Sequence, residues 1–181
     1  LFGAEGLVVL DGDDPRLKAL FAPHMETDML EGLAHRQVSD QAAGLQAADP
    51  DYPIQVTPRE INLFYMRDGL RERIVEEDGV YGVLETDIRM DREALKKELR
   101  EHPGRFSPNV ITRPLYQEVI LPNIAYIGGG GEIAYWLELK SYFEASEIPF
   151  PILMLRNSAL VLSDKQARKA EKLGVSLQEL F

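Results

Sequence analysis

Apolar and polar positions follow two different patterns along the chain, and the boundary lies near residue 107. From there on, strand-like apolar runs at residues 118–127 and 152–155 alternate with helical periodicity at residues 132–145 and 163–173. Strands that alternate with helices are typical of a parallel sheet covered by helices. This part of the chain therefore predicts an α/β core.

The helix expected at residues 132–145 has an apolar stripe at three- and four-residue spacings, which would pack on the sheet. Two carboxylates, Glu138 and Glu144, are expected to turn outward. The stripe consists of Ile133, Trp136, Leu137, Lys140 and Phe143. Gly174 stands where a C-cap glycine would end the last helix.

The first half of the chain has a less regular pattern. Residues 7–10 are apolar and β-branched and predict a strand, which an acidic Gly/Pro loop separates from a helix at residues 16–21. A weakly helical stretch and an exposed connection follow, up to residue 53. Residues 61–67, 70–76 and 80–85 predict a small antiparallel meander, because Gly69 and Gly79 can adopt the positive φ of tight hairpins. A helix is expected at residues 92–101.

We therefore predict an α/β fold with a partial Rossmann-like parallel sheet at residues 1–22 and 107–175. An inserted α+β connecting module with the meander would occupy residues 23–106, and residues 176–181 would start a C-terminal helix. The chain begins without Met, and Ser176 and Glu179 form a capping-box pattern just before its end. We expect an internal portion of a longer protein.

The composition and charge of the chain argue against several classes of function. The chain has 181 residues, 30 acidic and 20 basic, a formal charge of −10, and no cysteine. This charge would repel a phosphate backbone, so nucleic-acid binding is not expected. No run approaches the roughly 18 to 20 apolar residues that span a bilayer, and no signal peptide is evident, so we expect a cytoplasmic protein without a membrane partner.

Four glycines separate the strand expected at residues 118–127 from the helix after it. Without side chains, Gly128, Gly129, Gly130 and Gly131 let the backbone approach a ligand, and free N–H groups at the helix start can face an anion. The spacing matches neither the dinucleotide fingerprint nor a Walker motif. A tight structural turn explains the glycines equally well.

The carboxylate of Glu132 follows these glycines at the start of the helix, where the helix dipole stabilises it. It can equally accept a substrate amine or hydroxyl, and it would compete with a phosphate for the same N–H groups. Arg156, Asn157 and Ser158 follow the strand at residues 152–155, at the edge where open parallel sheets bind ligands. They could bind a carboxylate or phosphate, or simply form a loop.

Weaker candidates lie elsewhere. Asp11 and Asp13 could hold Mg²⁺ or a ribose hydroxyl, although acidic loops are more often solvated turns. Arg113 and Gln117 precede the strand that leads to the glycines, and their side chains could reach the ligand-facing edge at the glycine turn. The three histidines lack metal-ligand spacing, so we predict no metal site built on them.

Several segments together resemble the bacillithiol biosynthesis cysteine-adding enzyme family, BshC. The resemblance is carried by FSPNVITRPLYQEVILPNIAYIGGGGEIAYWLELK and IPFPILMLRNSALVL, with GLVVLDGDDPRLKALFAP and NLFYMRDGLRERI in support. Many members read Gly-Pro-Gly where this chain has Gly129, Gly130 and Gly131.

The resemblance implies a Rossmann-like core with connecting-peptide insertions and a C-terminal coiled coil that supports a homodimer. It implies a ligase that joins cysteine through an amide to the amine of glucosaminyl-malate, driven by ATP, with ATP or ADP and Mg²⁺ as the cofactors. The matching motifs contain Asn123, Tyr126, the four glycines, Glu132, Tyr135, Trp136, Arg156, Asn157 and Ser158. The catalytic residues are expected upstream of this chain. A nucleotide-binding module served by a partner protein, and an inert structural core, remain alternatives.

Overall fold

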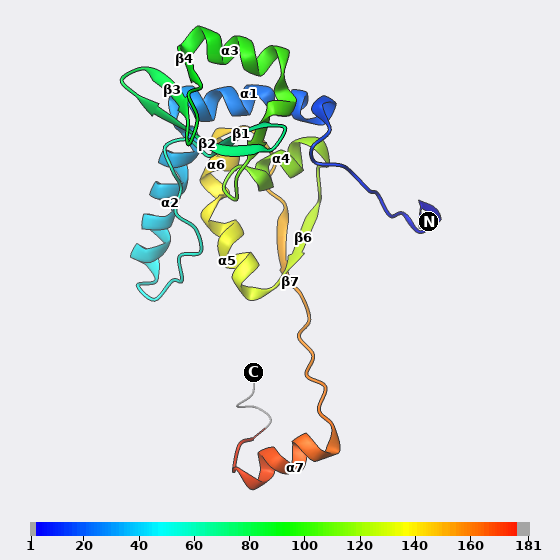
Figure 1. Cartoon of the computed structure of the whole chain (residues 1–181). Coiled ribbons are helices and arrows are strands. Elements are labelled where there is room, and N and C mark those ends of the chain that lie inside the picture. Colours follow the sequence, from blue (N-terminus) through cyan, green and yellow to red (C-terminus); the bar gives the residue numbers. More distant parts are fainter. Residues whose placement is uncertain (1–2, 177–181) are drawn as a thin grey trace.

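A computed structural model describes residues 3–176, which form two sheets surrounded by helices (Figure 1). The elements are a 3-10 turn Gly3–Glu5, α1 Pro15–Glu31, α2 Leu33–Ala48, β1 Leu63–Arg67, β2 Leu70–Glu77, β3 Val80–Val83, β4 Arg89–Met90, α3 Arg92–Glu101, a 3-10 turn Pro103–Arg105, β5 Phe106–Pro108, α4 Arg113–Ile120, β6 Ala125–Gly128, α5 Gly130–Glu138, α6 Lys140–Ala145, β7 Ile152–Leu155 and α7 Asp164–Lys172.

The meander predicted from the hairpin glycines is confirmed. Strands β1, β2 and β3 pair antiparallel in sequence order, and Gly69 and Gly79 have φ angles of 72° and 80° in the two turns. The full sheet has the order β4-β3-β2-β1-β5, since β5 returns to the free edge of β1. The helix predicted at residues 92–101 is also confirmed as α3, capped by Asp91.

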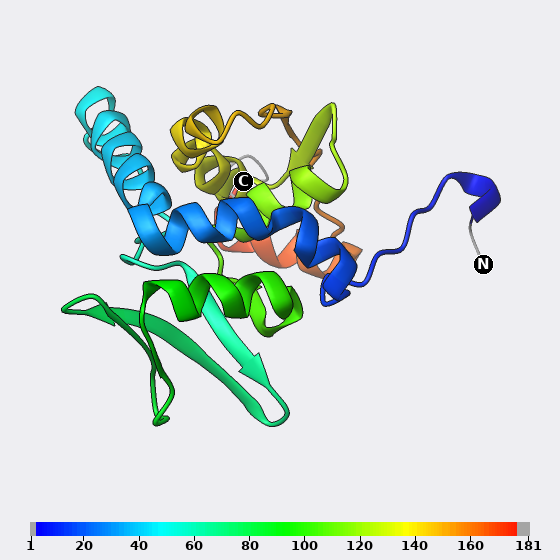
Figure 2. The same cartoon turned by 90° about the horizontal axis from the view of Figure 1, so that it is seen from above.

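Helix α1 runs through the middle of the molecule. Figure 2 shows it between α3 and the antiparallel sheet on one side and α4, α5 and β6 on the other. Its Phe21 and Met25 are fully buried, so it belongs to one continuous core. Gly32 ends it with a φ of 61°, the left-handed conformation that glycine adopts at a helix C-terminus, and α2 starts at the next residue.

Strands β6 and β7 form a separate parallel pair, as the alternating pattern predicted. Their inward side chains, Tyr126 and Leu153, pack on the core beside α5 and α6. The prediction of a strand throughout residues 118–127 was wrong, because residues 113–120 form helix α4. Its apolar residues Leu115 and Val119 lie four positions apart, and a short apolar run does not by itself distinguish a strand from a buried helix.

Three other expectations were also wrong. Residues 7–10 form no strand: they are extended and exposed, with no hydrogen-bonded neighbour strand among the described residues. Glu138, expected to turn outward, is fully buried, whereas Lys140 of the supposed apolar stripe is exposed. The helix expected at residues 132–145 is divided at Leu139 into α5 and α6, which changes the faces on both sides.

The outer face of the parallel pair is not covered by any of the described residues 3–176. Ile127 on β6 and Ile152 and Met154 on β7 are 65%, 64% and 50% exposed, although the apolar run at residues 152–155 is typical of a buried strand. Helices cover only the opposite face (Figure 1). Parallel sheets normally bury both faces, so this surface is suited to cover by further protein.

Helix α7 lies apart from the body at the end of a long connection (Figure 1). Ser163 caps it, and Gly174 follows it with a φ of 71°, as the sequence predicted. The helix expected to start at residues 176–181 lies almost entirely outside the described residues. Within residues 3–176, no helix is long and apolar enough to cross a membrane.

Candidate functional site

The glycine turn joins β6 to α5 at the carboxyl end of the parallel pair. A side chain on Gly128 would bring its Cβ within 2.8 Å of the Tyr126 ring, and one on Gly129 would come within 3.1 Å of the Arg156 guanidinium. Gly130 has open space around it and is the first residue of α5. A side chain on Gly128 would therefore force its neighbours to shift, whereas one on Gly129 would only displace the exposed Arg156 and Glu132 side chains.

Glu132 reaches back to this turn. Its Oε2 accepts a hydrogen bond of 2.7 Å from the Gly129 N–H and lies 3.7 Å from Nη1 of Arg156, while the Tyr126 hydroxyl lies 3.4 Å from Oε1. The Gly129 N–H, followed by the charge of Arg156 and the Tyr126 hydroxyl, lowers the pKa of Glu132, although desolvation opposes the shift. The glycine turn thus carries its own ionised carboxylate.

Arg156 is positioned by β7. Its backbone N–H donates to the Gly128 carbonyl at 2.9 Å, which continues the parallel pairing and brings the guanidinium to the turn. Its side chain is 66% exposed and that of Glu132 is 50% exposed. The two charges form an open pair that a ligand can reach. Asn157 and Ser158 follow as exposed loop residues, with no side-chain hydrogen bond to the described part of the chain.

Three other residues in the matching motifs have internal roles. Trp136 is buried, with ring centroids 4.3 Å from Tyr126 and 5.7 Å from Phe143. The Tyr135 hydroxyl donates to the Val110 carbonyl, and burial raises its pKa. Asn123 donates its backbone and side-chain N–H groups to buried Glu118. Trp136 thus packs on the strand that leads to the glycine turn, while Tyr135 ties α5 to residue 110 and Asn123 ties the segment before β6 to α4.

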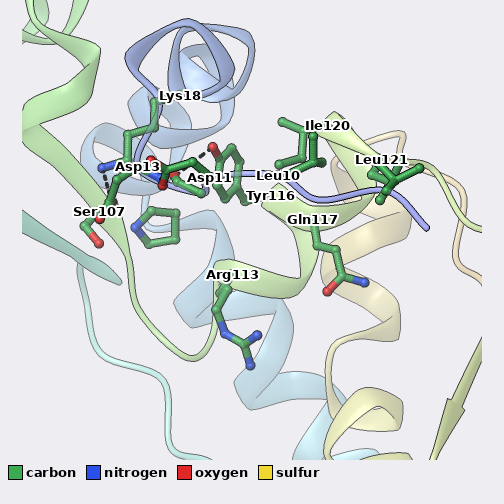
Figure 3. A pocket seen from close by; sticks show the side chains of 13 residues that line it. Leu10, Asp11, Asp13, Lys18, Ser107, Arg113, Tyr116, Gln117, Ile120 and Leu121 are labelled. Atoms are coloured by element: carbon green, nitrogen blue, oxygen red, sulfur yellow. Dashed lines mark hydrogen bonds and ion pairs between the residues drawn. The ribbon is translucent and has the colours of Figure 1, made fainter. Parts of the chain in front are cut away.

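The weaker candidates lie together around a second hollow, a cavity of about 540 Å³ (Figure 3). Asp11 and Asp13 approach it from the loop before α1, and Arg113 and Gln117 approach from α4. Arg113 has no carboxylate partner among the described residues, whereas the Gln117 amide donates to Glu118. Apolar residues on the exposed segment 7–10 and at the end of α4 complete the lining.

Sequence reasoning missed Lys18, which is 1% exposed beneath this cavity. Its Nζ lies 2.8 Å from Asp13 Oδ1 and donates to the Gly104 carbonyl at 3.3 Å. Tyr116 closes the same wall by donating to the Gly12 carbonyl at 3.0 Å. The only signal in the sequence was a lysine within the apolar periodicity of α1.

No group of three or more His, Asp or Glu side chains within residues 3–176 is arranged to hold a metal ion. His24 packs against Phe21, with ring centroids 5.4 Å apart, and burial lowers its pKa.

The fold and the turn define a Rossmann-like α/β domain in which Glu132 and Arg156 form an exposed ion pair at the carboxyl edge of a parallel sheet. A family model described as "Bacillithiol biosynthesis BshC, N-terminal Rossmann-like domain" matches residues 1–157. The chain belongs to this family, as the sequence motifs predicted.

Curated relatives agree with this assignment. The chain is 55% identical over 181 residues to the "Putative cysteine ligase BshC" of Christiangramia forsetii, 50% to that of Flavobacterium johnsoniae and 35% over 185 residues to that of Bacillus velezensis. These alignments cover 99 to 100% of this chain but only 33 to 34% of each relative. The chain therefore spans about a third of the length of the relatives it matches.

Proposed function

We propose that the full-length protein containing this chain is a ligase that joins cysteine through an amide bond to the amine of glucosaminyl-malate in bacillithiol biosynthesis. The observation that carries the proposal is the family match over residues 1–157, with relatives named as cysteine ligases along the whole chain. In such a reaction the amine attacks an activated carboxyl carbon, the amide C–N bond forms, and a phosphate or AMP leaves with the carboxyl oxygen.

The open pair at the glycine turn suits such substrates, which carry amines, hydroxyls and carboxylates. Arg156 would bind an anionic group of the substrate or of the activated intermediate, since a guanidinium can bind carboxylate or phosphate through two parallel hydrogen bonds. Glu132 would accept an amine or hydroxyl through Oε1, because its Oε2 is engaged by Gly129. The positions of both groups are held by backbone contacts of β6, β7 and α5.

We further propose that ATP drives the reaction. The residues of this chain fit a nucleotide only in part. The carboxylate of Glu132 already occupies the N–H of Gly129, and at the second cavity Lys18 is neutralised by Asp13, which leaves Arg113 as the cation without a carboxylate partner there. One arginine would not balance a triphosphate, so the remaining contacts are assigned to the part of the protein outside this chain, as is the proposed homodimer contact.

The decisive experiment incubates purified full-length protein with cysteine, glucosaminyl-malate and ATP and follows the thiol product by mass spectrometry. The ligase proposal expects product, with stoichiometric ATP cleavage, in the absence of any other protein. The main alternative is a nucleotide-binding module, which would bind ATP but form product only after a partner protein is added.

A further inference from the structure

The connection between α2 and β1, residues 49–62, lies beside the start of α5, although about 80 residues separate the two in sequence. The Tyr52 hydroxyl donates to the Ala134 carbonyl at 2.7 Å. The backbone N–H groups of Gln55 and Val56 donate to the two carboxylate oxygens of Glu138, at 2.7 and 3.3 Å. This loop is therefore fastened along the length of α5.

The buried carboxylate of Glu138 fixes the position of this loop. The side chain is fully buried, and the two N–H groups of the loop are its hydrogen-bond donors among the described residues. Burying a carboxylate is unfavourable unless it is hydrogen-bonded, so the loop and Glu138 stabilise each other in one arrangement.

The side chain of Gln55 is exposed, yet its amide orientation is defined. Its Nε2 donates to the Pro53 carbonyl at 2.7 Å, and because a carbonyl can only accept, the other amide atom must be the oxygen. This Oε1 lies 3.6 Å from where a Cβ on Gly131 would stand. No donor within residues 3–176 bonds to it. Gln55 thus presents a free acceptor at the first turn of α5, beside the glycine turn.

We propose that Gln55 is a specificity-determining residue, whose Oε1 accepts a hydrogen bond from a hydroxyl or amine of the substrate bound at the glycine turn. The assignment rests on the proposed function. A neutral carbonyl oxygen repels phosphate and carboxylate oxygens but suits the hydroxyls and amine of an amino sugar. Gln55 would thus select the amine-bearing substrate, and Glu138 would act as its positioning residue.

The test uses the full-length protein with Gln55→Met, which keeps the side-chain length but replaces the amide with a weak thioether acceptor. Gln46→Met, exposed on α2 without a side-chain hydrogen bond to the described residues, is the matched control. Loss of one neutral hydrogen bond predicts that the KM for glucosaminyl-malate rises about 3- to 10-fold in Gln55→Met. The KM for ATP, the thermal midpoint and the Gln46→Met enzyme should stay unchanged.

A calorimetric titration with glucosaminyl-malate separates this inference from the proposed function. If the wild type forms no product but Gln55→Met weakens binding of this probe, the function fails and the role of Gln55 stands. If product forms and Gln55→Met binds the probe as tightly as the wild type, only the role of Gln55 is overturned. The role is also overturned if the wild type does not bind the probe, or if the substitution weakens ATP binding equally.

Discussion

At the scale of single residues, the pair formed by Glu132 and Arg156 shows how one turn can combine structural and chemical roles. Glu132 stabilises the start of α5 by accepting from Gly129, the same N–H that a bound phosphate would use. The turn therefore favours a ligand with a donor for Glu132 and an anion for Arg156, rather than a phosphate alone.

Replacing Arg156 by Lys should test that role in the full-length enzyme. Lysine keeps the charge but cannot reproduce the bidentate fork, so kcat/KM for product formation is expected to fall about 10- to 100-fold. Arg100→Lys, exposed on α3, is the matched control and should behave as the wild type. An unchanged rate in Arg156→Lys would contradict the anion-binding role.

Asp28 should make stability depend on pH. It is 1% exposed, accepts from the Asn62 N–H at 2.7 Å, and burial raises its pKa from 3.8 to about 6 despite this bond. A raised folded pKa means that its contribution is fully present below about pH 3.8 and is lost as the pH rises through 6. A shift of this size corresponds to about 3 kcal/mol.

The substitution Asp28→Asn removes this titration but keeps an acceptor for Asn62. Relative to this variant, the wild type should lose on the order of 3 kcal/mol of unfolding free energy between pH 4 and pH 7. Urea unfolding at several pH values measures the difference. A difference that stays constant across this range would show that Asp28 does not titrate there.

At the scale of elements, alanine substitutions in the turn between β6 and α5 should change stability differently at different glycines. Gly128→Ala would place a Cβ 2.8 Å from the Tyr126 ring, which is itself stacked on Trp136. Overpacking of this kind should cost about 1–3 kcal/mol in unfolding free energy. Gly130→Ala meets no neighbour within 4 Å and lies in the helix, so it should be neutral or stabilising by up to about 1 kcal/mol. Equal effects of the two substitutions would contradict this account.

Most elements could be predicted because their signals are local. The hairpin glycines at positions 69 and 79 and the Asp91 cap of α3 act within a few residues, and these elements form where expected. The end of helix α4 was mistaken for a strand because Val119, Ile120 and Leu121 form a short continuous apolar run, which does not by itself distinguish a strand from a buried helix. Glu138 was misplaced because the helix divides at Leu139, which the sequence pattern did not indicate.

At the scale of the whole molecule, the bare face of β6 and β7 agrees with a chain that spans a third of its relatives' length. We expect the remainder of the full-length protein to cover Ile127, Ile152 and Met154. The predicted boundaries between a core and an inserted module, near residues 22 and 107, stay a prediction, since α1 packs on both sides.

Substitution Met154→Lys in the full-length protein should therefore bury a charge and lower the unfolding free energy by on the order of 3–5 kcal/mol. Val80→Lys, on the exposed hairpin side of β3, should change it by no more than about 0.5 kcal/mol. Thermal or urea unfolding compares the two. If Met154→Lys is as harmless as Val80→Lys, the outer face stays open to solvent.

The sequence by itself determined the antiparallel meander, helix α3, the parallel pair, the glycine turn and the family, because these depend on periodicity, caps and motifs within short windows. Only the tertiary structure decided that Glu132 and Arg156 share the turn, that Asp13 pairs with a buried Lys18, and that Gln55 stands over α5. Such contacts join residues from different elements, up to about 80 positions apart, and their geometry is set by how helices and sheets pack.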